Sequence, residues 1–510
     1  MMMKLKNLLI VIMLFGLVFS IKAQDEPVYI SKTQITRHIN RAGDGLKNGG
    51  PDVFDIDAQK LNQGIAEIMN QAIDSMAFPG AQVLIAKNGL VFYHQGFGYQ
   101  TYDKINAIDT TDIYDLASVT KTTASTLALM KLYDLGLFDP DKTMGDYFPK
   151  VAKGKKKHLV MRDVLAHQAG LQAWIPYWSE SQRRNGKYKN KTVSRDSSAK
   201  YPYRISEAGL FMHKDFIEKK IYKMIRKSKV SKDKKYVYSG LTFYLIPELV
   251  KRLSGKSFDQ FLYDEFYIPL EANTLRFNPK DEFDLDRIVP TEVDSFFRME
   301  ALHGDVHDEG AAMMRGISGN AGLFSRAGDL AKVYQMLLNG GSFEGKTYLK
   351  ASTIQEFTDC QFCEVGNRRG LGFDKPLVAY DANISSVAKG VSPESFGHTG
   401  YTGTLVWADP ANDLLFIFLS NRVYPTRNNS KIYQLNVRPN IHNLVYELLR
   451  VKEGTYTMEW DRDPEGDGME YPGLKEQFKY LYEAENENFC YSHCKTLLKL
   501  KTRCDLWVGK

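Results

Sequence analysis

The stretch "YDLASVTKTTASTLALMKLYDLG", residues 114–136, decides the fold predicted for this chain. It places Ser118 three residues before Lys121, a spacing that brings two side chains to the same face of a helix. Four further Ser-x-x-Lys matches begin at Ser197, Ser231, Ser386 and Ser492. The spacing alone therefore selects none of the five, and the surrounding sequence has to distinguish them.

A catalytic serine and lysine need particular surroundings. A serine hydroxyl is a poor nucleophile until a base takes its proton. Lysine serves as that base only where burial or nearby positive charge lowers its pKa. Ser118 opens an apolar run without a helix breaker before Gly136, which predicts a buried helix from about 118 to 135. The other four matches lie in basic, Gly- and Pro-containing or C-terminal tail segments. Ser118 and Lys121 are therefore the candidate pair.

Two more short motifs follow in the chain. Tyr238-Ser239-Gly240 stands directly before a predicted helix at about 240–253. His398-Thr399-Gly400 begins the stretch "HTGYTGTLVWADP", which reads as a strand region. A glycine on a strand lets the backbone approach a bound group closely, because it has no side chain.

In this order and at these separations, the three motifs resemble those of the serine hydrolases of the β-lactamase and penicillin-recognising group. The resembling branch includes class C β-lactamases, D-Ala-D-Ala carboxypeptidases and related esterases. The segments "DVLAHQAGL" and "GISGNAGLFSRAGDLAKVYQMLLNGG" are also similar to segments of this family. The resemblance covers about residues 60–450.

The resemblance implies a role for each motif residue. Ser118 would form an acyl-enzyme, and Lys121 would take its proton or hold the hydrogen-bond network. Tyr238 would share the base role and protonate the leaving group. His398 stands where many relatives have lysine, and would assist proton transfer or anchor a substrate carboxylate. The backbone N–H groups of Ser118 and Tyr401 would form the oxyanion hole. Substrate-binding positions would be Thr399, Gly400 and Gly240.

One position departs from the family pattern, because the tyrosine motif usually ends in asparagine or aspartate and here ends in Gly240. A site without that hydrogen-bonding group discriminates less well in favour of amide substrates. We therefore expect an exported hydrolase acting on cell-wall D-Ala peptides or small esters. The alternatives are a β-lactamase, and a non-catalytic descendant that binds cell-wall fragments or a partner.

The order of predicted elements indicates an α+β fold, in which an antiparallel sheet is flanked by helices and carries an inserted, mostly helical lobe. Two β-rich runs flank Asn88-Gly89, a strong hairpin signal. The predicted organisation is a linker at 24–55, a hydrolase domain at 56–452 with the lobe at about 116–300, and a tail of unknown role at 453–510.

The N-terminus and the overall charge bear on location and partners. Residues 1–23 have the pattern of a secretory signal peptide, with cleavage after Ala23, which predicts a periplasmic or secreted protein. The alternative is an N-terminal membrane anchor; no later stretch is long enough to span a bilayer. A net charge of +6 over 510 residues and the lack of a recognition motif argue against nucleic acid. The oligomeric state stays open.

Several polar groups remain as weaker candidates. Cys360, Cys363, Cys490 and Cys494 with His493 have the residue types of a zinc site, but their two pairs lie far apart in the chain, and we expect neither a metal nor an organic cofactor. His307 and Asp308 are either an acid–base or metal pair or a loop-ordering element. The basic segments 181–200 and 223–235 are predicted to be solvent-exposed, the first as a lid or a contact with anionic envelope polymers.

Overall fold

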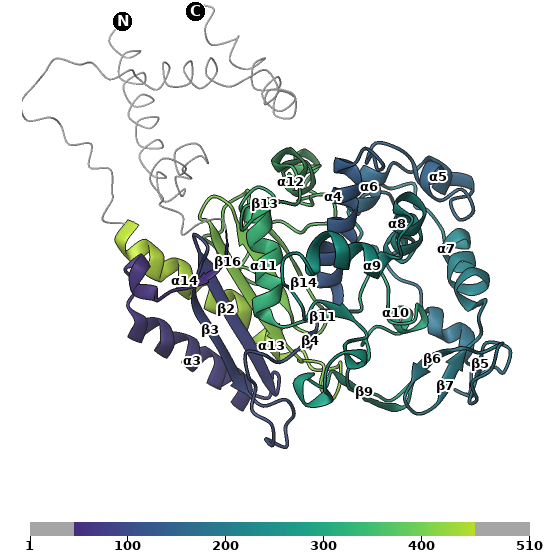
Figure 1. The fold of residues 1–510 in the computed structure, drawn as a ribbon, viewed down its shortest axis with the longest axis horizontal. Coiled ribbons are helices and arrows are strands. Elements are labelled where there is room, and N and C mark those ends of the chain that lie inside the picture. The colour runs from purple at the N-terminus through teal and green to yellow at the C-terminus, as the bar shows by residue number, and fades with distance from the viewer. Residues whose placement is uncertain (1–44, 454–510) are drawn as a thin grey trace, which may run out of the picture.

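The computed structural model describes residues 45–453 (Figure 1). The predicted signal peptide, most of the predicted linker and the tail from residue 454 lie outside the described residues, as do Cys490, His493 and Cys494. Among the helices of residues 45–453, none is both long enough and apolar enough to cross a membrane.

A six-stranded sheet joins the two ends of the described chain in the order β1-β3-β2-β16-β15-β14. Its strands are β1 (Lys47–Asn48), β2 (Gly80–Lys87), β3 (Leu90–Gly98), β14 (Phe396–Thr399), β15 (Leu405–Asp409) and β16 (Leu414–Ser420). Every pairing is antiparallel except β1 with β3. Asn88 and Gly89 connect β2 to β3 with φ angles of 52° and 75°, so the predicted hairpin is confirmed.

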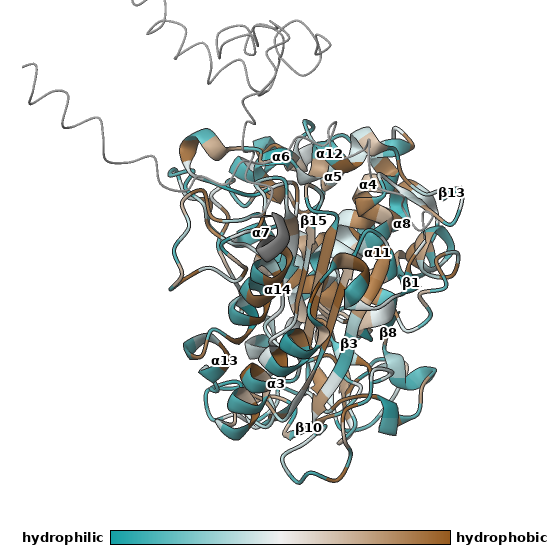
Figure 2. Cartoon of the chain, turned by 90° about the vertical axis from the view of Figure 1, so that its left-hand side faces the viewer, coloured by the Kyte–Doolittle hydropathy of each residue, from teal (hydrophilic) through white to brown (hydrophobic). Residues whose placement is uncertain are grey.

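Alternation along the strands builds two cores, one on each face of this sheet. Val83 and Ile85 of β2 pack with α3 (Ala58–Asp74) and α14 (Val437–Glu453). Leu84 and Ala86 join the opposite core with α11 (Ala327–Leu338). Figure 2 shows the hydrophobic central strands between helices whose outer surfaces are hydrophilic. Side chains at successive strand positions point to opposite faces, which explains this division.

The chain between β3 and β14 forms a mostly helical lobe with small sheets, at the right of Figure 1. Its α-helices are α4 (Leu127–Asp134), α5 (Met144–Tyr147), α6 (Met161–Leu165), α7 (Lys223–Lys227), α8 (Ile246–Ser254), α9 (Phe258–Leu262), α10 (Glu309–Met313) and α12 (Ala351–Thr358). Its strands include β4 (Tyr114–Asp115), β8 (Arg276–Phe277) and β11 (Leu323–Ser325), and also β5 (Val193–Ser194), β6 (Tyr203–Ser206) and β7 (Leu210–Met212). The predicted fold class is confirmed.

Candidate active site

Ser118 lies in a tight turn between β4 and the long helical segment of the lobe. The residue before it, Ala117, adopts a φ of 46°, a conformation that costs energy for a residue with a side chain. Three hydrogen bonds stabilise this turn. Asp115 accepts the N–H of Ala117 at 2.8 Å, and the hydroxyls of Thr402 and Thr404 donate to the carbonyls of residues 115 and 116. The loop after β14 therefore fixes the position of Ser118.

Lys121 reaches back over the same turn to the serine. Its Nζ lies 2.9 Å from Ser118 Oγ and 2.8 Å from the carbonyl oxygen of Asn320. The segment that carries it, η3 (Lys121–Thr126), is a π-helix and continues into α4, so the predicted helix is confirmed with an irregular first part. Tyr267 donates to the carbonyl of Thr123 within that turn at 2.8 Å. Such turns occur frequently at functional sites.

Tyr238 lies beside this pair. The ammonium of Lys121 is 5.4 Å from the centroid of the Tyr238 ring and 5.6 Å from that of Phe243. The Tyr238 hydroxyl is buried and has no hydrogen-bond partner among the described residues. The His167 ring packs 4.7 Å away, and its Nδ1 accepts the N–H of Ser239 at 3.1 Å. Buried hydroxyls are usually hydrogen-bonded, so the unpaired hydroxyl of Tyr238 is an exception among the described residues.

His398 on β14 completes the cluster but is not a cation. Burial, together with the neighbouring charges of Arg369 and Lys121, lowers the pKa of His398 to about 3. Its Nδ1 lies 2.6 Å from the carbonyl oxygen of Thr399, and its Nε2 lies 3.4 Å from Arg369 Nη1. The neutral ring donates a hydrogen bond from Nδ1 to Thr399 and accepts one at Nε2 from Arg369. The positive charge near this position is therefore that of Arg369.

Arg369 is a site residue that no sequence motif indicated. Its guanidinium is 5.3 Å from the centroid of the Tyr238 ring, and it donates to the Tyr236 hydroxyl at 3.1 Å. Asp374 lies 3.3 Å from its Nε and is also bound by Arg368 through two hydrogen bonds. Arg369 is almost fully buried, with 4% of its surface exposed. The positive charge of Arg369 therefore acts on Tyr238 and His398 from the protein interior, where the guanidinium is shielded from solvent.

The loop that carries Tyr401 packs against the turn that carries Ser118. Within the described residues, the backbone N–H of Tyr401 makes no hydrogen bond, and that of Ser118 makes none outside its own helical turn. Gly400 packs against the turn so closely that an added Cβ would lie 2.6 Å from the carbonyl oxygen of Leu116. The sequence predicted close approach to a bound group, whereas the structure shows a different reason for the glycine, namely close approach of two segments of the protein.

Gly240 faces open space. An added Cβ there would have no atom within 4 Å, and its φ angle is not in the left-handed region. The backbone N–H of Gly240 donates to the carbonyl oxygen of Ala173 at 3.2 Å. The residue that follows Ala173 in the chain, Trp174, is exposed. Neither backbone strain nor crowding explains why this position lacks the usual side chain.

His307 and Asp308 order loops around the site. The backbone N–H of His307 donates to Asp115 Oδ2 at 2.7 Å, and its ring stacks on Tyr401 with centroids 5.2 Å apart. Asp308 accepts the Ala311 N–H at the start of α10 and the hydroxyl of Tyr244 at 3.0 Å. The sequence left open whether His307 and Asp308 are an acid–base or metal pair or a loop-ordering element. These contacts favour the loop-ordering interpretation.

Cys360 and Cys363 form a disulfide, so they are not free thiolate ligands. Among the described residues, no group of histidine, cysteine, aspartate and glutamate side chains is arranged to hold a metal ion.

Comparisons with known proteins place the chain in a family. A family model described as Beta-lactamase matches residues 65–437. The chain belongs to this family of serine hydrolases. A protein of Escherichia coli (strain K12) named "Putative D-alanyl-D-alanine carboxypeptidase" is 29% identical over 411 residues, which cover 74% of this chain and 86% of that protein.

Two solved structures have the same fold. The hydrolase EstCE1, described as having promiscuous acyltransferase activity, is 19% identical with a TM-score of 0.53, and covers 75% of this chain and 99% of its own. A penicillin-binding protein homologue from Caulobacter crescentus is 17% identical with a TM-score of 0.52, and covers 77% of this chain and 98% of its own. The resemblance stated from the sequence is confirmed.

Proposed function

We propose that the protein is an exported hydrolase that transfers an acyl group to Ser118 and then to water, with D-Ala-terminated cell-wall peptides or small esters as substrates. The observation that carries the proposal is the 2.9 Å separation of Lys121 Nζ and Ser118 Oγ. Proton transfer needs such a distance, and positioned bases contribute about 10²–10⁴ in rate. The name of the E. coli relative supports the D-Ala peptide substrate.

The proposed reaction uses the groups described above. Lys121 takes the proton of Ser118 as its oxygen attacks the substrate carbonyl, and the oxyanion accepts the N–H groups of Ser118 and Tyr401. Tyr238 donates a proton to the leaving amine or alcohol, which gives the acyl-enzyme. Lys121 then passes the proton it took from Ser118 to Tyr238, which restores both groups. Water attacks the acyl-enzyme carbonyl while Lys121 takes a proton from it, and the Ser118–acyl bond breaks as that proton returns to Ser118 Oγ. Removing one oxyanion donor from such a site costs about 10²–10³ in rate.

Covalent labelling tests this proposal. The purified protein is treated with a fluorophosphonate probe and with a fluorescent penicillin, and the modified residue is identified by mass spectrometry, with Ser118→Ala as the control. We expect an adduct on Ser118 that is lost in Lys121→Ala while the circular dichroism spectrum is unchanged. The absence of any Ser118 adduct would favour a non-catalytic, ligand-binding descendant of the family. Rapid turnover of the penicillin would favour a β-lactamase.

Export has its own test. We expect the mature N-terminus at Gln24 after expression in a Gram-negative host, together with recovery in the periplasmic fraction. A full-length protein in the membrane fraction would instead support an N-terminal anchor.

A further inference from the structure

The formal charge of this chain is concentrated in one segment of the lobe. Residues 181–235, called here the cationic segment, contain eighteen lysine and arginine residues but five aspartate and glutamate residues. That is a net charge of +13, whereas the whole chain carries +6. The remainder of the chain is therefore net acidic, and the molecule is electrically polarised.

The cationic segment forms one edge of the molecule. It contains β5, β6, β7 and α7, which lie at the side of the lobe farthest from the six-stranded sheet (Figure 1). Lys156 extends it, because its Nζ donates to the carbonyls of Arg226 and Ser228, and the neighbouring Lys153, Lys155 and Lys157 are exposed. One continuous surface thus carries a large excess of positive charge.

Most of these charges lack an acidic partner within residues 45–453. Five of the eighteen form ion pairs there, namely Arg204, Lys219, Lys220, Lys234 and Lys235. Like charges that crowd a surface repel one another and lower stability, so an uncompensated excess of this size is a cost to the free protein. A bound polyanion would remove that cost.

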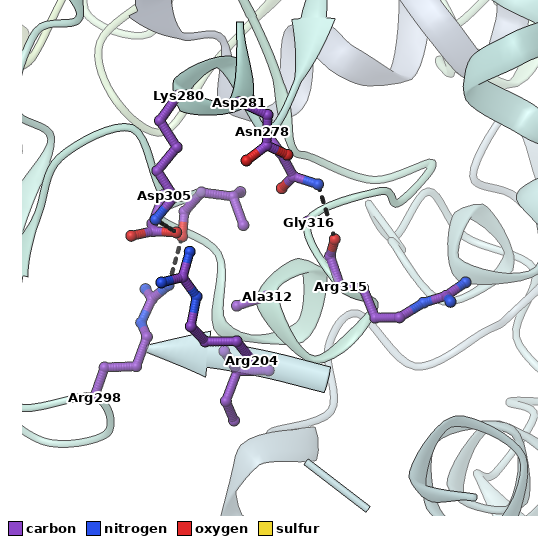
Figure 3. Close-up of a pocket in the computed structure, with 11 residues that line it drawn as sticks. Arg204, Asn278, Lys280, Asp281, Arg298, Asp305, Ala312, Arg315 and Gly316 are labelled. Carbon is purple, nitrogen blue, oxygen red and sulfur yellow. Dashed lines mark hydrogen bonds and ion pairs between the residues drawn. The ribbon is translucent and has the colours of Figure 1, made fainter. Parts of the chain in front are cut away.

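A pocket at the edge of the segment is not the anion site. It has a volume of about 160 Å³ and is lined by Arg204, Lys280 and Arg298 among others (Figure 3). Lys280 forms ion pairs with both Glu207 and Asp305, and Arg298 binds Asp294. These cations are therefore paired with carboxylates, whereas most cations on the open surface of the segment are not.

The segment ends at the catalytic tyrosine. The backbone N–H of Ser231 donates to the carbonyl oxygen of Gly170, and that of Val237 donates to the carbonyl oxygen of His167. Residues 231–237 therefore run alongside the loop that packs on Tyr238. Lys232, Lys234 and Lys235 are exposed on this run, directly before Tyr236. A polymer lying along the segment would therefore reach the candidate active site.

The surface chemistry distinguishes a polymer from a bilayer. Proteins that bind membrane surfaces combine basic residues with exposed apolar side chains that enter the lipid. None of the large hydrophobic side chains exposed in the described structure lies within residues 181–235. Tyr236 and Val237, directly after the segment, are exposed, so large apolar groups occur only at the end nearest the candidate active site. Along the rest of its length the segment offers charge without an apolar group to enter a bilayer, which suits a hydrated polyanion.

We propose that the cationic segment binds an anionic glycan polymer, whose repeat units carry carboxylates or phosphates, and thereby presents acyl groups attached to it to the Ser118 site. The binding part stands on charge alone, and the presentation part rests on the proposed function. The natural substrate would then be polymer-linked, and affinity would fall with salt because exposed charges are screened.

The test uses a charge reversal with a matched control. Lys187, Lys191, Lys227 and Lys232 are exposed, and their side chains make no ion pair within residues 45–453, so replacing all four by glutamate changes charge without breaking contacts. The control replaces Lys47, Lys104, Lys142 and Lys389, which are exposed elsewhere, in the same way. Both variants keep every residue of the candidate active site.

Three surfaces are offered to each protein: insoluble peptidoglycan, which presents carboxylates; a teichoic-acid-type glycan, which presents phosphates; and phosphatidylglycerol vesicles. We expect wild type and control to co-sediment with, or bind, at least one glycan at about 50 mM salt and to be released at about 500 mM. The segment variant should bind about tenfold or more weakly. The preferred glycan identifies the anion.

Equal glycan binding by the segment variant would overturn the proposal, as would binding to vesicles alone or to none of the three surfaces. Hydrolysis of p-nitrophenyl acetate is measured in parallel and is expected to be unchanged in both variants. A wild-type protein that binds glycan but neither hydrolyses the ester nor acquires a Ser118 adduct would refute the proposed function while leaving polymer binding intact.

Discussion

Arg369 gives the sharpest test of how the candidate site works. Replacing it by glutamine removes the positive charge that lies 5.3 Å from the Tyr238 ring. At an effective dielectric constant of about 20, a unit charge at that distance stabilises a phenolate by about 3 kcal/mol. If Tyr238 carries negative charge while it exchanges a proton, Arg369→Gln should lower kcat/KM for an ester about a hundredfold.

Two further variants separate charge from structure. Arg368→Gln removes the same charge from the same loop and loses two bonds to Asp374, but Arg368 makes no described contact with Tyr238 or His398. It should retain activity within about threefold. The double variant Arg369→Gln with His398→Lys returns a cation to β14 and should recover at least about tenfold of the loss.

The assay is steady-state ester hydrolysis, with the rate of penicillin acylation as a second readout and thermal unfolding as a check of folding. The reasoning is refuted if Arg369→Gln keeps wild-type kcat/KM. It is also refuted if Arg368→Gln loses as much activity as Arg369→Gln, because the loop would then matter for shape rather than charge.

Three other changes probe particular features. Gly400→Ala places a Cβ 2.6 Å from the Leu116 carbonyl and should abolish acylation by penicillin; normal labelling would contradict the close-approach argument. Gly240→Asn enters open space, so it should fold normally and raise the ratio of amide or β-lactam to ester turnover, measured as kcat/KM for both substrates; an unchanged ratio would show that this position does not contact substrate. Burial lowers the pKa of His442 from 6.5 to about 3. Between these two pH values the unfolded chain binds a proton at His442 that the folded chain does not bind. The free energy of unfolding therefore falls as the pH falls through this range. His442→Phe should reduce the loss of unfolding free energy between about pH 6.5 and 4.5 by up to about 3 kcal/mol in urea titrations, and an unchanged loss would refute this assignment.

The sequence was sufficient to predict the fold class and the hairpin formed by β2 and β3. Those features depend on local signals, such as the Asn88-Gly89 turn between two β-rich runs. Selecting Ser118 among five matches likewise needed its apolar helix and the two distant motifs.

The rest of the site follows from contacts that leave no local pattern. Asn320 contacts Lys121 through its backbone oxygen, which every residue has, so the side-chain type gives no sign of it. Arg369 lies in a loop of charged residues, and its relation to His398 exists only after β14 pairs with β15. His167 and Asn320 do fall in the two segments that resemble family segments, and those segments were the available signal for them.

The π-helical turn at Lys121–Thr126 separates two requirements that a continuous α-helix would couple. Each residue of an α-helix is rotated by about 100° from the last, so the direction of one side chain fixes that of every other. The wider π-helical turn changes the rotation about the helix axis between Lys121, which faces Ser118, and α4, which packs in the core. A deletion of one residue within it would restore α-helical winding and swing Lys121 away while α4 kept its neighbours. The direction of the Lys121 side chain is thus set separately from the packing of α4.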